Sequence, residues 1–150
     1  MSELHILLIF HLLGATIWVG GHILLTVVIL PQVWKEKSVE KLFNFESRYE
    51  WFGMPALGIM LLTGIRMAYL YNVKVLTWFT FKTPIERVVS LKLCCLITIA
   101  ILALSAQFLV LPRLKTDYKK LPLMTFHILS VTVISIMMLV LGSFVRYGGI

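Results

Sequence analysis

The stretch HLLGATIWVGGHILLTVVIL, residues 11–30, contains no acidic residue, lysine or arginine. Extended back to residue 4, it gives a run of 27 residues without such a charge, whereas a helix needs about 20 apolar residues to cross the hydrocarbon core of a bilayer. No positive residue precedes the run and no small-residue cleavage site follows it. It is also longer than the ~7–15 residues of a signal-peptide core. The run therefore predicts a first membrane-spanning helix over residues 4–30.

Three further apolar stretches follow, over residues 51–71, 84–111 and 122–145. Hydrophobic residues make up 59% of the chain and charged residues only 14%, against about 25% charged residues in soluble domains. Almost nothing is left over for a soluble domain. The sequence predicts an all-α fold in which residues 1–150 form one integral membrane domain, a four-helix up-down bundle.

Proline and capping signals mark the ends of these helices. Pro31 is expected to end or kink the first helix, and Pro112 to close the third. The sequence TPIE at residues 83–86 is a capping box with proline at the first helical position, and Pro122 opens the fourth helix. Residues 38–50 carry apolar residues near helical spacing. They predict either an extension of the second helix or a helix on the membrane surface.

The net charge of +7 comes from basic residues at or near the helix ends, which is typical of membrane anchoring rather than of nucleic-acid binding. Four spans put both termini on one side of the membrane, here called the near side. The loops 31–50 and 112–121 lie on the far side and hold eight of the 14 lysines and arginines. Positive loops favour the cytoplasm. The sequence thus predicts a bacterial inner-membrane protein with both termini outside, in the periplasm.

Polar side chains inside a bilayer cost free energy and therefore indicate functional sites. Those within the predicted spans are His11, His22, Arg66, Lys92, Gln107 and His127. His11 and His22 point within about 20° of each other around the first helix and lie about 16 Å apart along it. Trp18 lies on the same face. One face of the first helix therefore presents two imidazoles at two depths.

Counting residues from the helix ends places these groups in two layers. His22 and His127 share a depth toward the far side, and His11 and Lys92 share one toward the near side. Two imidazoles that face each other across a bundle can hold a haem iron at both axial positions. We therefore predict one haem b between His22 and His127. His11 and Lys92 would form a second haem site, for which the lysine must lose its proton, or a polar pocket for a quinone headgroup.

Two arginines are candidates to bind haem propionates: Arg48 at the far side and Arg66 at the near side. Structural roles are open for several of these residues. A single histidine can simply hydrogen-bond a neighbouring helix, as can Gln107, while Lys92 and Arg66 can reach the membrane surface and Trp18 can pack in the core. The methionines are scattered, and the adjacent cysteines 94 and 95 point about 100° apart, so sulfur coordination of a metal has little support from spacing.

The run HLLGATIWVGG, residues 11–21, resembles the first-helix signature of the CopD/HemJ superfamily of membrane proteins. The sequences LKL at 91–93 and LPRL at 111–114 resemble the lysine-bearing helix of the same group, although Ser90 stands where HemJ-like chains typically place a histidine. The resemblance implies copper resistance or uptake for the CopD branch. For the HemJ branch it implies protoporphyrinogen oxidation and bound haem b. It also implicates the residues that match, His11 and Lys92.

The two histidine layers favour a b-type cytochrome-like protein that exchanges electrons with the quinone pool or a respiratory partner protein, as a homo-oligomer or as a subunit. Copper uptake or resistance is the first alternative, with His11, His22 and His127 as metal ligands, and protoporphyrinogen IX oxidation is the second. The sequence contains no nucleophile–base pair, phosphate loop or dinucleotide fingerprint. Any catalysis would therefore be redox or transport chemistry through a cofactor.

Overall fold

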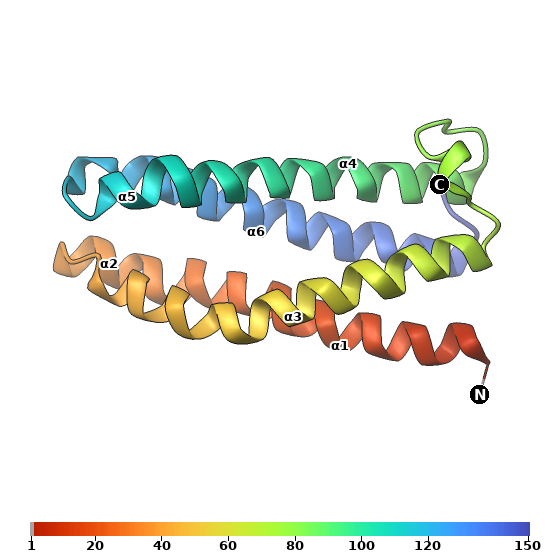
Figure 1. Cartoon of the computed structure of the whole chain (residues 1–150), viewed down its shortest axis with the longest axis horizontal. Coiled ribbons are helices and arrows are strands. Elements are labelled where there is room, and N and C mark those ends of the chain that lie inside the picture. The colour runs from red at the N-terminus through yellow and green to blue at the C-terminus, as the bar shows by residue number, and fades with distance from the viewer. Residues whose placement is uncertain (1) are drawn as a thin grey trace.

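The computed structural model describes residues 2–150, and in this part of the chain four long helices alternate in direction (Figure 1). All four are long and apolar enough to cross a membrane. Both termini lie at the same end of the molecule, so the predicted all-α up-down bundle is confirmed. The elements are α1 (Glu3–Leu24), η1 (Leu25–Ile29), α2 (Leu30–Glu36), α3 (Glu40–Leu70), η2 (Val75–Thr77), α4 (Pro84–Ser105), η3 (Ala106–Val110), α5 (Leu111–Leu114), η4 (Tyr118–Lys120), α6 (Leu121–Phe144) and η5 (Val145–Tyr147).

Pro31 and Pro112 do not end their helices, contrary to the expectation for Pro112. In both places a five-residue π-helical turn, η1 or η3, comes just before the proline. The helix then continues to Glu36 or Leu114, six and three residues beyond the predicted ends. Proline lacks a backbone N–H and its ring clashes with the carbonyl four residues earlier, and a wider π turn accommodates both defects. Proline therefore reshapes these two helices without ending them.

The second membrane helix is longer than its apolar stretch, because α3 begins at Glu40. Residues 40–50 thus extend this helix, which was one of the two predicted alternatives. Leu42 of the extension is buried in a far-side cluster with Val33 of α2, Leu114 of α5 and Leu121 of α6. This cluster joins the far ends of all four long helices.

The capping signals at the start of α4 and α6 are confirmed. Thr83 Oγ1 accepts a hydrogen bond from the Glu86 backbone N–H (3.2 Å), and Glu86 Oε2 accepts one from the Thr83 N–H (3.1 Å). Pro122 lies in the first turn of α6. Each proline at these starts fits because the first turn of a helix has no partner for that N–H.

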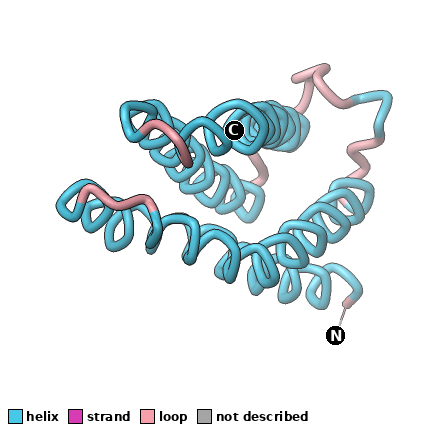
Figure 2. The backbone as a smooth tube through the Cα atoms, turned by 60° about the vertical axis from the view of Figure 1, so that its left-hand side comes forward, coloured by secondary structure: helices cyan, strands magenta, loops and turns pink. Residues whose placement is uncertain are grey.

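The helices pack as two pairs, α1 with α3 and α4 with α6, and the pairs meet along α1 and α6 (Figures 1 and 2). At this meeting, Thr26 in η1 and Thr132 in α6 share a hydrogen bond of 2.8 Å. Thr132 also donates to its own-helix Ile128 carbonyl (2.8 Å). Threonine side chains joining helices in this way are typical of membrane bundles.

Glycines let α1 and α3 approach closely. A Cβ on Gly21 would overlap the Tyr49 ring, and one on Gly14 would lie 2.9 Å from the Ala56 carbonyl oxygen. The Tyr49 hydroxyl, held on this surface, donates to the Trp18 carbonyl oxygen (2.9 Å). These contacts fix the register of the two helices, with Gly21 level with Tyr49.

Substituting Gly21→Ala tests this packing. The added methyl group has no space beside Tyr49, so we expect the free energy of unfolding to fall by about 1–3 kcal/mol. Gly20→Ala is the matched control, because a Cβ there meets nothing within 4 Å. Unfolding of both variants in mixed micelles, followed by circular dichroism, measures the difference. Equal stability of the two variants would contradict the proposed register.

Candidate functional site

His11 is held by α3. Its Nδ1 lies 2.9 Å from Thr63 Oγ1, and the Thr63 hydroxyl donates its proton to the Ile59 carbonyl oxygen at 2.6 Å. A hydroxyl has one proton, so the Thr63 oxygen must accept from the His11 ring. The ring lies against Gly64, where a Cβ would approach it to 3.2 Å. The fold therefore fixes the proton of His11 on Nδ1.

His22 is held within its own helix. Its Nδ1 lies 2.9 Å from the Trp18 carbonyl oxygen, which can only accept, so Nδ1 carries the proton. The Trp18 ring lies 4.6 Å and the Tyr49 ring 5.9 Å from the imidazole, measured between centroids. Two aromatic side chains thus restrict the ring, and its orientation is set by a backbone carbonyl.

Both imidazoles of α1 consequently direct an Nε2 lone pair away from the group that holds them. Within residues 2–150 neither Nε2 has a hydrogen-bond partner. Metal-binding histidines typically donate the other ring N–H to a carbonyl or another oxygen, which fixes the tautomer and orientation of the ring. Each of these two histidines therefore has the outer hydrogen bond of a metal ligand and a free nitrogen to act as one.

His127 differs, because both of its ring nitrogens are occupied. Nδ1 donates to the Leu123 carbonyl oxygen (2.8 Å), and Nε2 lies 3.1 Å from Ser105 Oγ, from which it accepts. The side chain is buried between α6 and α4. Its hydrogen bonds account fully for its presence in the bundle, which matches the structural alternative that the sequence left open.

The structure does not bring His22 and His127 face to face. Thr132 contacts Thr26 and, at 3.4 Å, the His22 carbonyl oxygen, so Thr132 is level with this turn of the first helix. His127 lies five residues nearer the far end, about 7.5 Å along α6, and its Nε2 faces Ser105. Haem iron between the two rings would require the Ser105 bond to break and the helices to shift, and the residues as arranged do not fit that group.

The near-side residues come from the two helix pairs, which meet along α1 and α6. His11 faces α3, whereas Lys92 Nζ lies against α6, 3.4 Å from where a Cβ on Gly142 would be. Lys92 has no ion pair or hydrogen bond within the described part of the chain. The second haem site and the quinone pocket predicted there stay predictions.

The other predicted site residues lie at separate places in the structure. Arg66 Nε pairs with Glu3 Oε1 at 2.6 Å on the exposed near-side edge, which is the anchoring role. Trp18 is half-buried and supplies the carbonyl that holds His22. Gln107, expected to bond another helix, is exposed and has no partner among residues 2–150. Arg48 lines a groove at the far side that is described below.

The sequence did not reveal the side chains that position the imidazoles. Thr63 and Tyr49 belong to the apolar stretch of the second helix or its extension, and no spacing rule sets them apart from core residues. The pair Thr63–Gly64 was the one available signal, because small and hydroxyl residues gather where membrane helices touch. Ser135, whose buried hydroxyl has no partner in the described chain, was also missed. It lies one turn from Thr132, toward the near side.

No group of three or more His, Cys, Asp or Glu side chains in residues 2–150 is arranged to hold a metal ion. Any metal bound by an α1 imidazole must therefore take other donors. Met60 is a soft donor on the turn next to Thr63: it packs on Gly14, and its carbonyl is 3.3 Å from Thr63 Oγ1. Met67 lies one helical turn beyond Thr63 and is half-buried. Thioethers thus lie on both sides of the turn that holds His11.

Comparison with known proteins gives one family. The family described as copper resistance protein D (CopD) matches residues 44–146, from α3 to η5. The matched region includes Arg48, Lys92 and His127, while both α1 histidines precede it. No curated protein and no solved structure matched the chain.

Thr63→Val tests how His11 is held. Valine has the same shape but accepts no hydrogen bond, which leaves the His11 Nδ1 proton unpaired in an apolar bundle. We expect the free energy of unfolding to fall by about 1–3 kcal/mol. Thr98→Val is the control, since that exposed hydroxyl bonds only to Cys94 of its own helix turn. If the two variants unfold alike in micelles, Thr63 does not hold the histidine.

Proposed function

Since this chain belongs to the copper resistance protein D family, we propose that it binds copper within the membrane and that His11 and His22 are the imidazole ligands. The observation that carries the proposal is that both rings have their Nδ1 proton held by an oxygen and their Nε2 free. Neutral imidazole nitrogen is a good copper ligand. The ion is the substrate of the protein, and the chain handles it by uptake or by export for resistance.

The donors around His11 favour the Cu(I) state. Cu(I) prefers soft ligands, among which thioethers rank with thiolates, and it accepts low coordination numbers. Met60 and Met67 lie on the turns of α3 that flank Thr63. One imidazole with one or two of these thioethers would supply neutral donors only, so the loaded site would carry the single charge of Cu(I).

Two sites at two depths would provide a route across the bundle. His22 and His11 lie on one face of α1 about 16 Å apart along its axis, too far to share an ion. The buried Ser135 hydroxyl, without a partner, lies on α6 just to the near side of Thr132. We infer that an ion entering from the far side binds first at His22 and then at His11. With the far side cytoplasmic, as the basic loops favour, movement from His22 to His11 would be export. Movement from His11 to His22 would be uptake.

Copper content of the purified protein tests this assignment. After loading with Cu(I) and removal of excess metal, His11→Ala and His22→Ala should each lose about half of the bound copper, and the double variant nearly all of it. His5→Ala is the control, because His5 is exposed at the near-side end of the same helix. Elemental analysis normalised to protein concentration measures the effect.

Two results would contradict the copper proposal. The first is that the wild-type protein retains no more copper than a triple variant with His5→Ala, His11→Ala and His22→Ala. The second is copper content that depends on His127→Ala and not on His11 or His22, because the His127 Nε2 is engaged by Ser105.

Haem b is the second candidate, favoured by the surroundings of His22. Its imidazole ring lies beside two aromatic rings, and Arg48, next to Tyr49 in the chain, has no acidic partner in the described residues. His22 would hold the haem iron, and the haem would supply redox chemistry: electron exchange with quinone or a respiratory partner protein, or protoporphyrinogen IX oxidation. A pyridine hemochrome spectrum of protein expressed with ample haem decides it: stoichiometric haem lost in His22→Ala supports this candidate, and its absence excludes it.

A partner in the membrane would account for Gln107. This amide is exposed on the third helix, without a hydrogen bond in residues 2–150, at a depth where polar groups call for partners. We propose that a second copy of the chain, or a partner subunit, packs on this face, which would make the protein a homo-oligomer or part of a larger assembly.

A further inference from the structure

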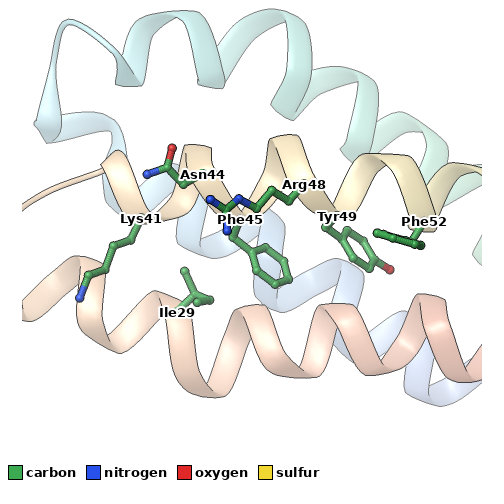
Figure 3. A pocket seen from close by; sticks show the side chains of 7 residues that line it. All are labelled: Ile29, Lys41, Asn44, Phe45, Arg48, Tyr49 and Phe52. Carbon is green, nitrogen blue, oxygen red and sulfur yellow. The ribbon is translucent and has the colours of Figure 1, made fainter.

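A groove of about 460 Å³ opens between the far-side half of the first helix and the start of α3 (Figure 3). Its walls are almost entirely apolar at the end nearer the membrane centre and cationic at the other. The lining residues are Ile29, Lys41, Asn44, Phe45, Arg48, Tyr49 and Phe52. The groove has no side chain in common with the copper ligands proposed above.

Arg48 is the unusual member of this lining. Its side chain runs back along α3 toward the start of the helix, and the guanidinium lies beside Phe45 (Figure 3). Residues 2–150 contain two ion pairs, neither of which includes Arg48, and no hydrogen bond to its side chain. Lys41, by contrast, is already bonded to Glu36 (2.6 Å) and Gln32 (3.1 Å).

Arg48 is exposed and lies in the extension of α3 that precedes the apolar stretch of this helix, at its far-side end. Its neighbour Tyr49 packs on Gly21, so Arg48 is level with the His22 turn of the first helix. Ile29, on the opposite wall, lies eight residues farther along that helix, about 12 Å toward the far side. Arginines near the ends of membrane helices bind anions or extend to the headgroup layer.

The rest of the groove suits an acyl chain. Phe45 and Tyr49 stack at 5.5 Å between ring centroids, and Phe52 continues the wall toward the membrane centre. A ligand that fills this groove must therefore present an anionic group to Arg48 and hydrocarbon to three aromatic rings.

We propose that this groove is a binding site for one anionic phospholipid of the far leaflet, with its phosphate on Arg48 and an acyl chain along Phe45, Tyr49 and Phe52. Charge complementarity selects the headgroup, because a guanidinium forms paired hydrogen bonds with a phosphate. Basic pockets between membrane helices bind anionic lipid headgroups in the same way. The groove shares no side chain with the proposed copper ligands, whereas a lipid phosphate on Arg48 would take the place of a haem propionate there.

Native mass spectrometry of the full chain tests the proposal. Delipidated protein is titrated with phosphatidylglycerol, with phosphatidylcholine of the same acyl chains, and with glycerol phosphate as the headgroup alone. We expect one tightly bound phosphatidylglycerol, weaker phosphatidylcholine and no retention of glycerol phosphate. Arg48→Gln should weaken phosphatidylglycerol about tenfold, as for loss of one charged hydrogen-bonding group, and Arg48→Lys should restore part of the affinity.

Arg113→Gln is the matched control, because it removes one exposed cation from the same end of the molecule without touching the groove. Phe52→Ala keeps Arg48 and should reduce binding of long-chain lipid more than of short-chain lipid, which preserves a test if Arg48→Gln fails to fold. Three results would overturn the proposal. The protein could retain the two lipids equally, or Arg48→Gln and Arg113→Gln could lose phosphatidylglycerol equally. The third is that glycerol phosphate binds as tightly as the lipid. A bound second protein chain that Arg48→Gln releases while lipid stays would also overturn it.

Discussion

The close contact between α1 and α3 determines where both imidazoles of the first helix lie. Gly21 receives the Tyr49 ring, Gly14 receives Met60, and Gly64 receives the ring of His11 itself. In a bilayer, helices gain nothing from burying apolar surface against each other, so association depends on close packing and on hydrogen bonds. The glycines supply the first, and Thr63 and Tyr49 supply the second. Without this contact His11 would lose the Thr63 oxygen that fixes its tautomer, and the ring of His22 would lose the Tyr49 side chain beside it.

The hydrogen bonds divide the three histidines inside the bundle into two kinds. His11 and His22 each give their Nδ1 proton to an oxygen and keep Nε2 free, whereas His127 uses both nitrogens. A polar group inside a membrane must find a partner. A fully bonded histidine has met this requirement, and one with a free lone pair has capacity left for a ligand. The difference separates histidines that serve the fold from those available to copper.

The bilayer explains why the sequence predicted the helices well and the site only in part. Length and apolarity alone specify a membrane span, so the four helices and their alternating direction could be predicted from the sequence. The TPIE box correctly predicted the start of α4. The expectation that Pro112 closes the third helix was wrong, because a π turn allows the helix to continue past the proline. The shared face of His11 and His22 followed from helical spacing. The pairing of His22 with His127 rested on counted depth, which carries no information on how each helix is rotated about its axis. That rotation turned His127 toward Ser105.

The tautomers of the histidines are therefore the central claim, and nitrogen NMR of protein labelled at the histidine side chains measures them directly. We expect His11, His22 and His127 each to carry a proton on Nδ1 before metal is added. On addition of Cu(I), the Nε2 resonances of His11 and His22 should shift while those of His127 stay in place. Protonation of His11 or His22 at Nε2, or a Cu(I) response confined to His127, would contradict the account.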